Sequence, residues 1–148
     1  MANRNGSGIG HFTTWLTAFG DAWEAADAPR MASLFVVGAT LQPTPFVELL
    51  RGRKQIEAYF EELVAGVEGV EFSAEALGAG KTYGVAHWRV AARVPMGLGG
   101  PIPRVRDGVL VCALDPRGRC TSLRWWWHET EEPPQDSLAM TQQQQEGS

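Results

Sequence analysis

The chain has 148 residues, of which 44% are apolar and 20% charged, and this composition fits one globular domain with a sizeable core. A formal net charge of −4, without a basic run interleaved with aromatic residues, argues against a nucleic-acid partner. No run of about 18 apolar residues predicts a membrane span. The first residues also lack the hydrophobic segment of a secretory signal. We therefore expect a cytoplasmic protein with no membrane attachment.

The chain opens with a segment that has little to bury. Residues 1–10 are rich in Gly, Asn and Ser and are interpreted as a flexible leader. From His11 onward, aromatic and aliphatic residues recur at three- and four-residue spacings, which predicts a helix. Such a stripe is usually part of the core. In a domain with a cavity, one edge of it can also line that cavity, and we name Trp15 and Phe19 as ligand-binding candidates.

Two more helices and a strand are expected next. Asp27 as a cap and Pro29 in the first turn predict a short second helix. Residues 36–42 are a strand candidate, and a third helix is expected over about 53–64. Tyr59 on this helix is either a packed core aromatic residue or a hydroxyl offered to a ligand.

The second half of the chain changes to a β pattern. Four runs rich in strand-forming residues, separated by turn residues, cover 70–77, 84–94, 104–114 and 119–129. From residue 131 to 148 the chain consists largely of Pro, Gln and Glu and is interpreted as a disordered tail. Helices followed by an antiparallel sheet indicate an α+β fold with the helices on one face of the sheet.

Three adjacent tryptophans stand in the last predicted strand. Side chains alternate along a strand, so Trp125 and Trp127 share one face and Trp126 lies on the other. If residues 115–118 form a type I turn with Gly118 as a bulge, Trp125 lies opposite Val109 and Trp127 opposite Asp107.

This pairing divides the sheet into two faces. A symmetric loop at 95–103 adds two polar residues to the mixed face, which suits a ligand pocket and comprises His87, Arg89, Asp107, Val109, Trp125 and Trp127. The apolar face suits a homodimer interface and comprises Trp88, Val90, Leu110, Cys112 and Trp126. A register error of one residue would exchange the two assignments.

Two cysteines flank the predicted turn. Cys112 and Cys120 are offset across the predicted strand pair, which is poor geometry for a disulfide. The three histidines show none of the usual metal-ligand spacings. We expect two buried thiols, no metal and no cofactor.

Several segments, in this order, resemble the nuclear transport factor two-like cone, and specifically its SnoaL-like group. They are Trp23-Glu-Ala-Ala-Asp27, Pro45-Phe46, Arg51-Gly52-Arg53-Lys-Gln-Ile56-Glu-Ala-Tyr59, Arg106-Asp107-Gly108-Val109 and Gly118-Arg-Cys-Thr-Ser-Leu-Arg-Trp-Trp-Trp-His128. The resemblance implies a cone domain over residues 11–130, in which three helices pack on a strongly curved, mostly antiparallel sheet around a pocket. It also implies that a dimer often forms through the outer face of the sheet. It does not imply one activity, since members include isomerases, hydrolases, cyclases and non-catalytic binders.

Acid–base chemistry has two candidate residues. Asp107 is the first and His87 the second, while an equally simple interpretation is that Asp107 only pairs with Arg89. Limonene epoxide hydrolase-like and ketosteroid isomerase-like sequences carry catalytic carboxylates that this chain lacks at the matching places: residues 89–91 and 124–128 for the former, 42–46 for the latter. Whether the protein is an enzyme therefore stays open.

Three hypotheses follow. The first is an isomerase, cyclase or lyase that acts on a small apolar molecule through Asp107 and His87. The second is a non-catalytic protein that binds such a molecule in a Trp-lined pocket, and the third is a dimeric interaction module without a ligand. An open, dry pocket that exposes His87 and Asp107 would favour the first hypothesis. A cone filled by tryptophan would favour the third.

Overall fold

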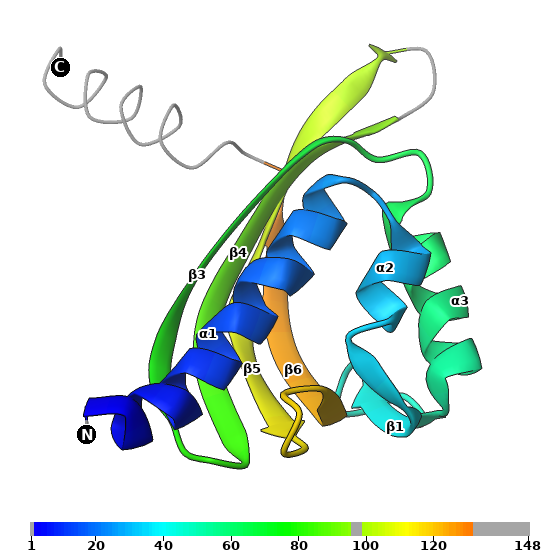
Figure 1. Cartoon of the computed structure of the whole chain (residues 1–148). Coiled ribbons are helices and arrows are strands. Elements are labelled where there is room, and N and C mark those ends of the chain that lie inside the picture. The colour runs from blue at the N-terminus through cyan, green and yellow to red at the C-terminus, as the bar shows by residue number, and fades with distance from the viewer. Residues whose placement is uncertain (1, 96–98, 132–148) are drawn as a thin grey trace, which may run out of the picture.

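A computed structural model describes residues 2–95 and 99–131 (Figure 1), with side chains from residue 10 onward. Its helices are α1 (Ala2–Glu24), α2 (Ala28–Ala32) and α3 (Arg53–Val64). Its strands are β1 (Phe35–Gln42), β2 (Leu50–Arg51), β3 (Glu68–Ala79), β4 (Tyr83–Pro95), β5 (Pro101–Leu114) and β6 (Cys120–Thr130). The chain is thus an α+β fold, with three helices and a six-stranded sheet in the described residues, as expected.

The sheet is curved and mostly antiparallel. Its strand order is β2-β1-β6-β5-β4-β3, and the one parallel pair in the described sheet joins β1 to β6. Helix α1 crosses the hollow side of the sheet, while α2 and α3 lie beside β1 (Figure 1). α1 begins at Ala2, so the segment expected to be a flexible leader is helical from Ala2 to Gly10. The expected tail lies outside the described residues apart from Glu131.

The expected pairing of β5 with β6 is correct beside the turn and wrong beyond it. Leu114 pairs with Cys120, in the same register as the predicted pairs of Trp125 with Val109 and Trp127 with Asp107, but Ala113 already pairs with Ser122, so Thr121 is an extra residue in β6. This β-bulge shifts the rest of the strand by one residue. Trp125 therefore lies opposite Leu110 rather than Val109, and Trp127 lies opposite Gly108 rather than Asp107.

The shift exchanges the partners of the tryptophans. The β4–β5 register is as expected, with Arg89 opposite Asp107, but this pair now lies on the face opposite to Trp125. We call the face toward the helices the inner face and the other the outer face. Of the residues predicted to form the dimer interface, Trp88, Val90, Leu110 and Cys112 are buried in the core, and only Trp126 lies on the outer face.

Aromatic rings fill most of the cone. Phe19 of α1 stacks on Trp15 at 4.8 Å between ring centroids and lies 6.2 Å from Trp125. Trp88 and Trp125 lie 5.2 Å apart on neighbouring positions of the inner face. Side chains of this size account for most of the free energy that core burial contributes. The interior is thus largely packed where the family resemblance implied a pocket.

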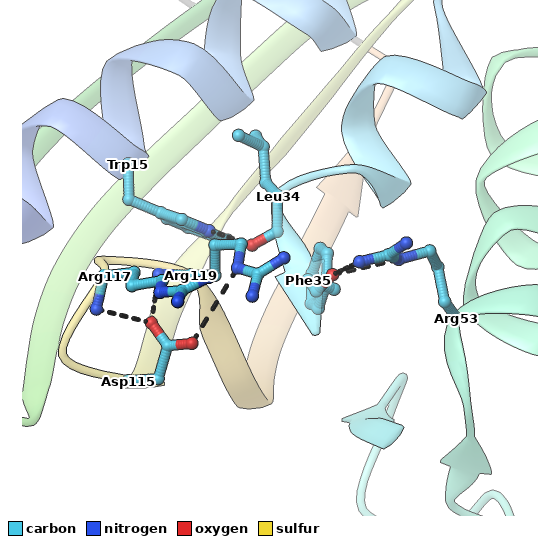
Figure 2. Close-up of polar contacts among 7 residues, drawn as sticks. All are labelled: Trp15, Leu34, Phe35, Arg53, Asp115, Arg117 and Arg119. Atoms are coloured by element: carbon cyan, nitrogen blue, oxygen red, sulfur yellow. Dashed lines mark hydrogen bonds and ion pairs between the residues drawn. The ribbon is translucent and has the colours of Figure 1, made fainter. Parts of the chain in front are cut away.

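A few polar contacts fix the helices and turns to the sheet (Figure 2). The indole N–H of Trp15 donates to the carbonyl oxygen of Leu34 at 3.0 Å. The guanidinium of Arg53 donates from Nε at 3.0 Å and from Nη2 at 2.6 Å to the carbonyl oxygen of Phe35. In the turn before β6, Oδ1 of Asp115 accepts the backbone N–H of Arg117 and of Arg119, each at 2.9 Å.

Both cysteines are buried and free, as expected. Burial raises the pKa of the Cys112 thiol, and the neighbouring Cys120 raises it further. A thiol held in its neutral form is a poor nucleophile. The pair therefore belongs to the core.

Candidate functional site

A small cavity remains inside the cone where the aromatic packing ends. It has a volume of about 40 Å³ and lies between the C-terminal ends of α1 and α3 and the parts of β4 and β5 nearest their hairpin. We call it the hairpin cavity. Its apolar wall consists of Trp23, Leu63, Val67, Val90, Ala92 and Val94.

Two arginines form the charged side of the hairpin cavity. Arg104 and Arg106 occupy alternate positions of β5 and pair with Ala92 and Val90, so both lie on the inner face. Nε of Arg106 donates to Oε1 of Glu129 at 2.8 Å, and its guanidinium lies 4.5 Å from the ring centroid of Trp127. This ion pair and cation–π contact hold Arg106 in place.

Arg104 is less completely paired. Its Nε lies 3.7 Å from Oε2 of Glu129, and its Nη2 lies 3.9 Å from Oε1 of the exposed Glu131. Both distances exceed that of a hydrogen bond, and Nε is buried with no hydrogen-bond partner in the part of the chain that the structure describes. Arg104 therefore has a donor free at the edge of the cavity.

Tyr59 lies near this arginine side. Burial raises the pKa of the Tyr59 hydroxyl, while the charge of Arg106 and the indole N–H of Trp125 act to lower it. That indole N–H makes no regular hydrogen bond to another described residue, because Nε1 of Trp125 is among the buried atoms without such a partner. The hydroxyl is therefore held in its neutral form, which can donate a hydrogen bond.

The two residues predicted to be catalytic meet on the outer face. Nε2 of His87 lies 2.8 Å from Oδ1 of Asp107, and Nε of Arg89 donates to Oδ2 of Asp107 at 2.8 Å. An ionised carboxylate only accepts, so Nε2 of His87 is the donor in this contact. Burial would raise the pKa of Asp107, but hydrogen bonds from His87 and Arg89, together with their charges, bring it below its ordinary value.

An open groove of about 480 Å³ lies beside this pair on the outer face. We call it the outer groove. Phe46 is 98% exposed, while Trp126 is 39% and Val109 38% exposed, so the groove has an uncovered apolar wall. Its remaining lining residues are Thr44, Pro45, His87, Asp107, Gly108, Trp127 and His128.

The residues predicted for a single pocket therefore occupy three places. Trp15, Phe19 and Trp125 are buried in the core, each at most 2% exposed. Tyr59 and Trp127 are partly buried against that core, near Arg106. His87, Arg89, Asp107 and Val109 lie together on the outer face.

The sequence analysis missed the residues that surround the hairpin cavity. Arg104 and Arg106 alternate with Val105 in β5 and precede the buried Leu110 by an even number of positions, which places them on its face. That pattern could have identified them once Leu110 was assigned to the inner face. The bulge at Thr121 concealed this assignment, because it moved Trp125 opposite Leu110.

Similarity to solved structures supports the fold. SalBIII, an epoxide hydrolase/cyclase-like enzyme with a role in pyran ring formation in the polyether salinomycin, matches with a TM-score of 0.64 and 20% identity over 78% of this chain and 89% of its own. RV0760c from Mycobacterium tuberculosis, solved with estradiol-17beta-hemisuccinate, matches with a TM-score of 0.67 and 14% identity over 81% and 98%. A computationally designed 17-OHP binder matches with a TM-score of 0.68 and 14% identity over 81% and 97%.

The family to which the chain belongs is shown by its sequence. No curated protein gives a significant match to the chain. No helix in the described residues is long and apolar enough to cross a membrane. The model of the SnoaL-like domain matches residues 16–132, which is most of the chain and covers the cone from α1 to β6. The chain therefore belongs to the SnoaL-like family, as the segments from Trp23 to His128 led us to expect.

Proposed function

We propose that this protein binds a small, largely apolar molecule in the hairpin cavity. The observation that carries the proposal is an apolar wall left uncovered at the end of a filled cone, with Trp23 and Leu63 on one side and two arginines on the other. Ligand pockets are concave and mostly apolar, with a few convergent polar groups. Family membership and the small molecules named for similar structures support the proposal.

The cavity must widen to admit a ligand. A water molecule needs roughly 10–15 Å³ of cavity measured in this way, so about 40 Å³ suits a few waters but no ring system. Leu63 is half-buried at the end of α3, so it can move with less loss of core packing than the buried lining residues Trp23 and Val90. The proposal is therefore a pocket that opens as its ligand enters.

A pair of alanines on β4 provides a matched test. Ala92 lines the hairpin cavity, whereas Ala91 pairs with Val105 on the opposite face of the sheet, and both are half-buried. We expect Ala92→Leu to weaken binding of 2-naphthalenemethanol by about tenfold or more, because the added side chain fills the cavity. Ala91→Leu should leave binding within a few-fold of wild type. Isothermal titration calorimetry measures both affinities, and equal effects of the two changes would contradict the site.

Acid–base chemistry by Asp107 and His87 is a second proposal, with a different location. It is favoured by the 2.8 Å contact between them at the floor of the outer groove, and it requires a substrate in that groove rather than inside the cone. The condition for an enzyme acting inside the cone is not met, since neither residue lies there. If a reaction is found, Asp107→Asn should slow it by about 10²–10⁴-fold. Full activity in both Asp107→Asn and His87→Ala would show that the assignment is wrong.

A homodimer through the outer face is a third proposal, and it competes with the second. Trp126 and Val109 are exposed on this face beside Phe46, and a contiguous apolar patch on a sheet often marks an interface. A partner subunit seated there would cover His87 and Asp107. The outer face therefore serves either association or an outer-groove reaction. In both cases the hairpin cavity, which lies on the inner face, is left uncovered.

A further inference from the structure

One polar group that borders the hairpin cavity, Nε of Arg104, is a hydrogen-bond donor without an acceptor among the described residues. Among the described residues, Nε1 of Trp88 and Nε1 of Trp125 on the inner face are also buried without hydrogen-bond partners, but neither tryptophan lines the cavity. Trp23, which lines the cavity, lies 5.7 Å from Trp88 and 5.8 Å from Trp125 between ring centroids. A buried donor without an acceptor is costly, so Arg104 favours a ligand that brings one.

The charges at the cavity edge also favour a ligand that carries a hydrogen-bond acceptor. Two guanidinium groups line the cavity, and the nearest carboxylate, that of Glu129, makes its short contact of 2.8 Å with Arg106 alone. Within residues 2–95 and 99–131, Arg104 has only the two long contacts, one of them to a residue whose side chain is 67% exposed. An acceptor that carries a negative charge would gain more from Arg104 than a neutral one, because charge-assisted hydrogen bonds are the stronger kind.

From the free donor of Arg104 and the two positive charges we infer that the ligand is an apolar molecule with a carboxylate, whose apolar body contacts Trp23 and Leu63 and whose carboxylate pairs with Arg104. The inference rests on the proposed function and adds the chemical class of the ligand. Arg106 stays bound to Glu129 and stacked on Trp127, so it lines the cavity without pairing with the ligand. Arg104 makes the direct contact with the ligand's carboxylate.

Three probes with the same ring system test the inference in the full-length protein. They are 2-naphthoate, 2-naphthalenemethanol and 2-naphthylmethylamine, which carry an anionic, a neutral and a cationic group at neutral pH. We expect 2-naphthoate to bind about tenfold more tightly than the alcohol, with the amine weakest. The preference should shrink as salt is raised, since partly exposed ion pairs are screened. Calorimetry at two ionic strengths measures all three affinities.

Variants of charged residues on neighbouring strands locate the contact. Arg104→Gln should remove the preference for 2-naphthoate while the alcohol still binds. Arg93→Gln, at an exposed position on the opposite face of β4, should keep the preference. Glu129→Gln should strengthen 2-naphthoate binding a few-fold, because it releases Arg106.

The possible results separate this inference from the proposed function. Equal affinity for the three probes, or a preference for the amine, would overturn the inference while the proposed binding site stands. A preference for 2-naphthoate that persists in Arg104→Gln would also overturn it, because the carboxylate would then be recognised elsewhere. If none of the probes binds at millimolar concentration, the proposed function fails and the inference fails with it.

Discussion

At the scale of single residues, the ionisation of Tyr59 should depend on the fold. Burial raises the pKa of its hydroxyl above the ordinary value of 10.0, against the opposing effects of Arg106 and Trp125. Because the folded-state pKa is raised, the contribution to stability is complete below the unfolded-state pKa of about 10. It is then lost as the pH rises through the folded-state pKa.

The chain contains two tyrosines, so Tyr83→Phe leaves Tyr59 as the one that absorbs as tyrosinate. We expect the absorbance of this variant to change with a midpoint above pH 10 when folded and near 10 in urea. In the converse variant, Tyr59→Phe, stability should fall less steeply above pH 10 than in Tyr83→Phe. A folded midpoint at or below 10 would show that Tyr59 is solvated and not packed as described.

One residue also decided how much of the site could be predicted. The alternation of side chains correctly placed Trp125 and Trp127 together on the inner face. Their partners across the strand depended on Thr121, which forms a bulge although nothing in its residue type requires one. The need for glycine at position 108 could not be predicted either, because it depends on a close contact across the strand pair. A Cβ atom there would lie 1.9 Å from the backbone oxygen of Trp126. Close approach of this kind follows from the tertiary structure.

At the scale of elements, Arg53 should tie α3 to the start of β1. Its two donors reach the carbonyl oxygen of Phe35, a residue with no exposed surface (Figure 2). Arg53→Met keeps an aliphatic side chain but leaves this carbonyl unpaired, so we expect a loss of about 1–3 kcal/mol in the free energy of unfolding. Lys54→Met, at the exposed neighbouring position, is the control and should change it by less than about 0.5 kcal/mol. Urea denaturation measures both, and equal effects would contradict the assigned role of Arg53.

Elements with a local physical signal were the most predictable. Helix α2 begins as expected, with the side chain of Asp27 accepting the N–H of Arg30 at 3.1 Å, and α3 has the predicted bounds of Arg53 and Val64. The turn at 115–118 also formed, with Gly118 at a φ of 82°. Caps, turn residues and helical periodicity act within a few residues, so they can be seen in the sequence. Strand pairing depends on residues far apart and was less secure.

At the scale of the whole molecule, the sequence predicted a cone-shaped domain but not how much of its interior the side chains fill. The same aromatic residues can line a cavity or fill it, and the difference depends on ring orientations that no spacing fixes. Here Trp15, Phe19 and Trp125 fill the interior, which leaves the hairpin cavity at the end where Trp23 stands. A filled cone was the condition that favoured an interaction module, and this makes the outer face as important to test as the cavity.

The last prediction concerns that outer face. If two copies associate through Trp126 and its neighbours, Trp126→Glu should weaken the homodimer by about 2 kcal/mol or more, as central interface tryptophans commonly do. The charge would be introduced at a side chain that is 39% exposed in one subunit, so the fold itself should persist. Leu77→Glu is the matched control, because Leu77 is an apolar residue of the edge strand β3 with 58% of its surface exposed. Sedimentation velocity at micromolar concentration should show dimers for wild type and Leu77→Glu, and mainly monomers for Trp126→Glu. A wild-type protein that sediments only as a monomer would rule out the interface, and the outer groove would then be free for a substrate.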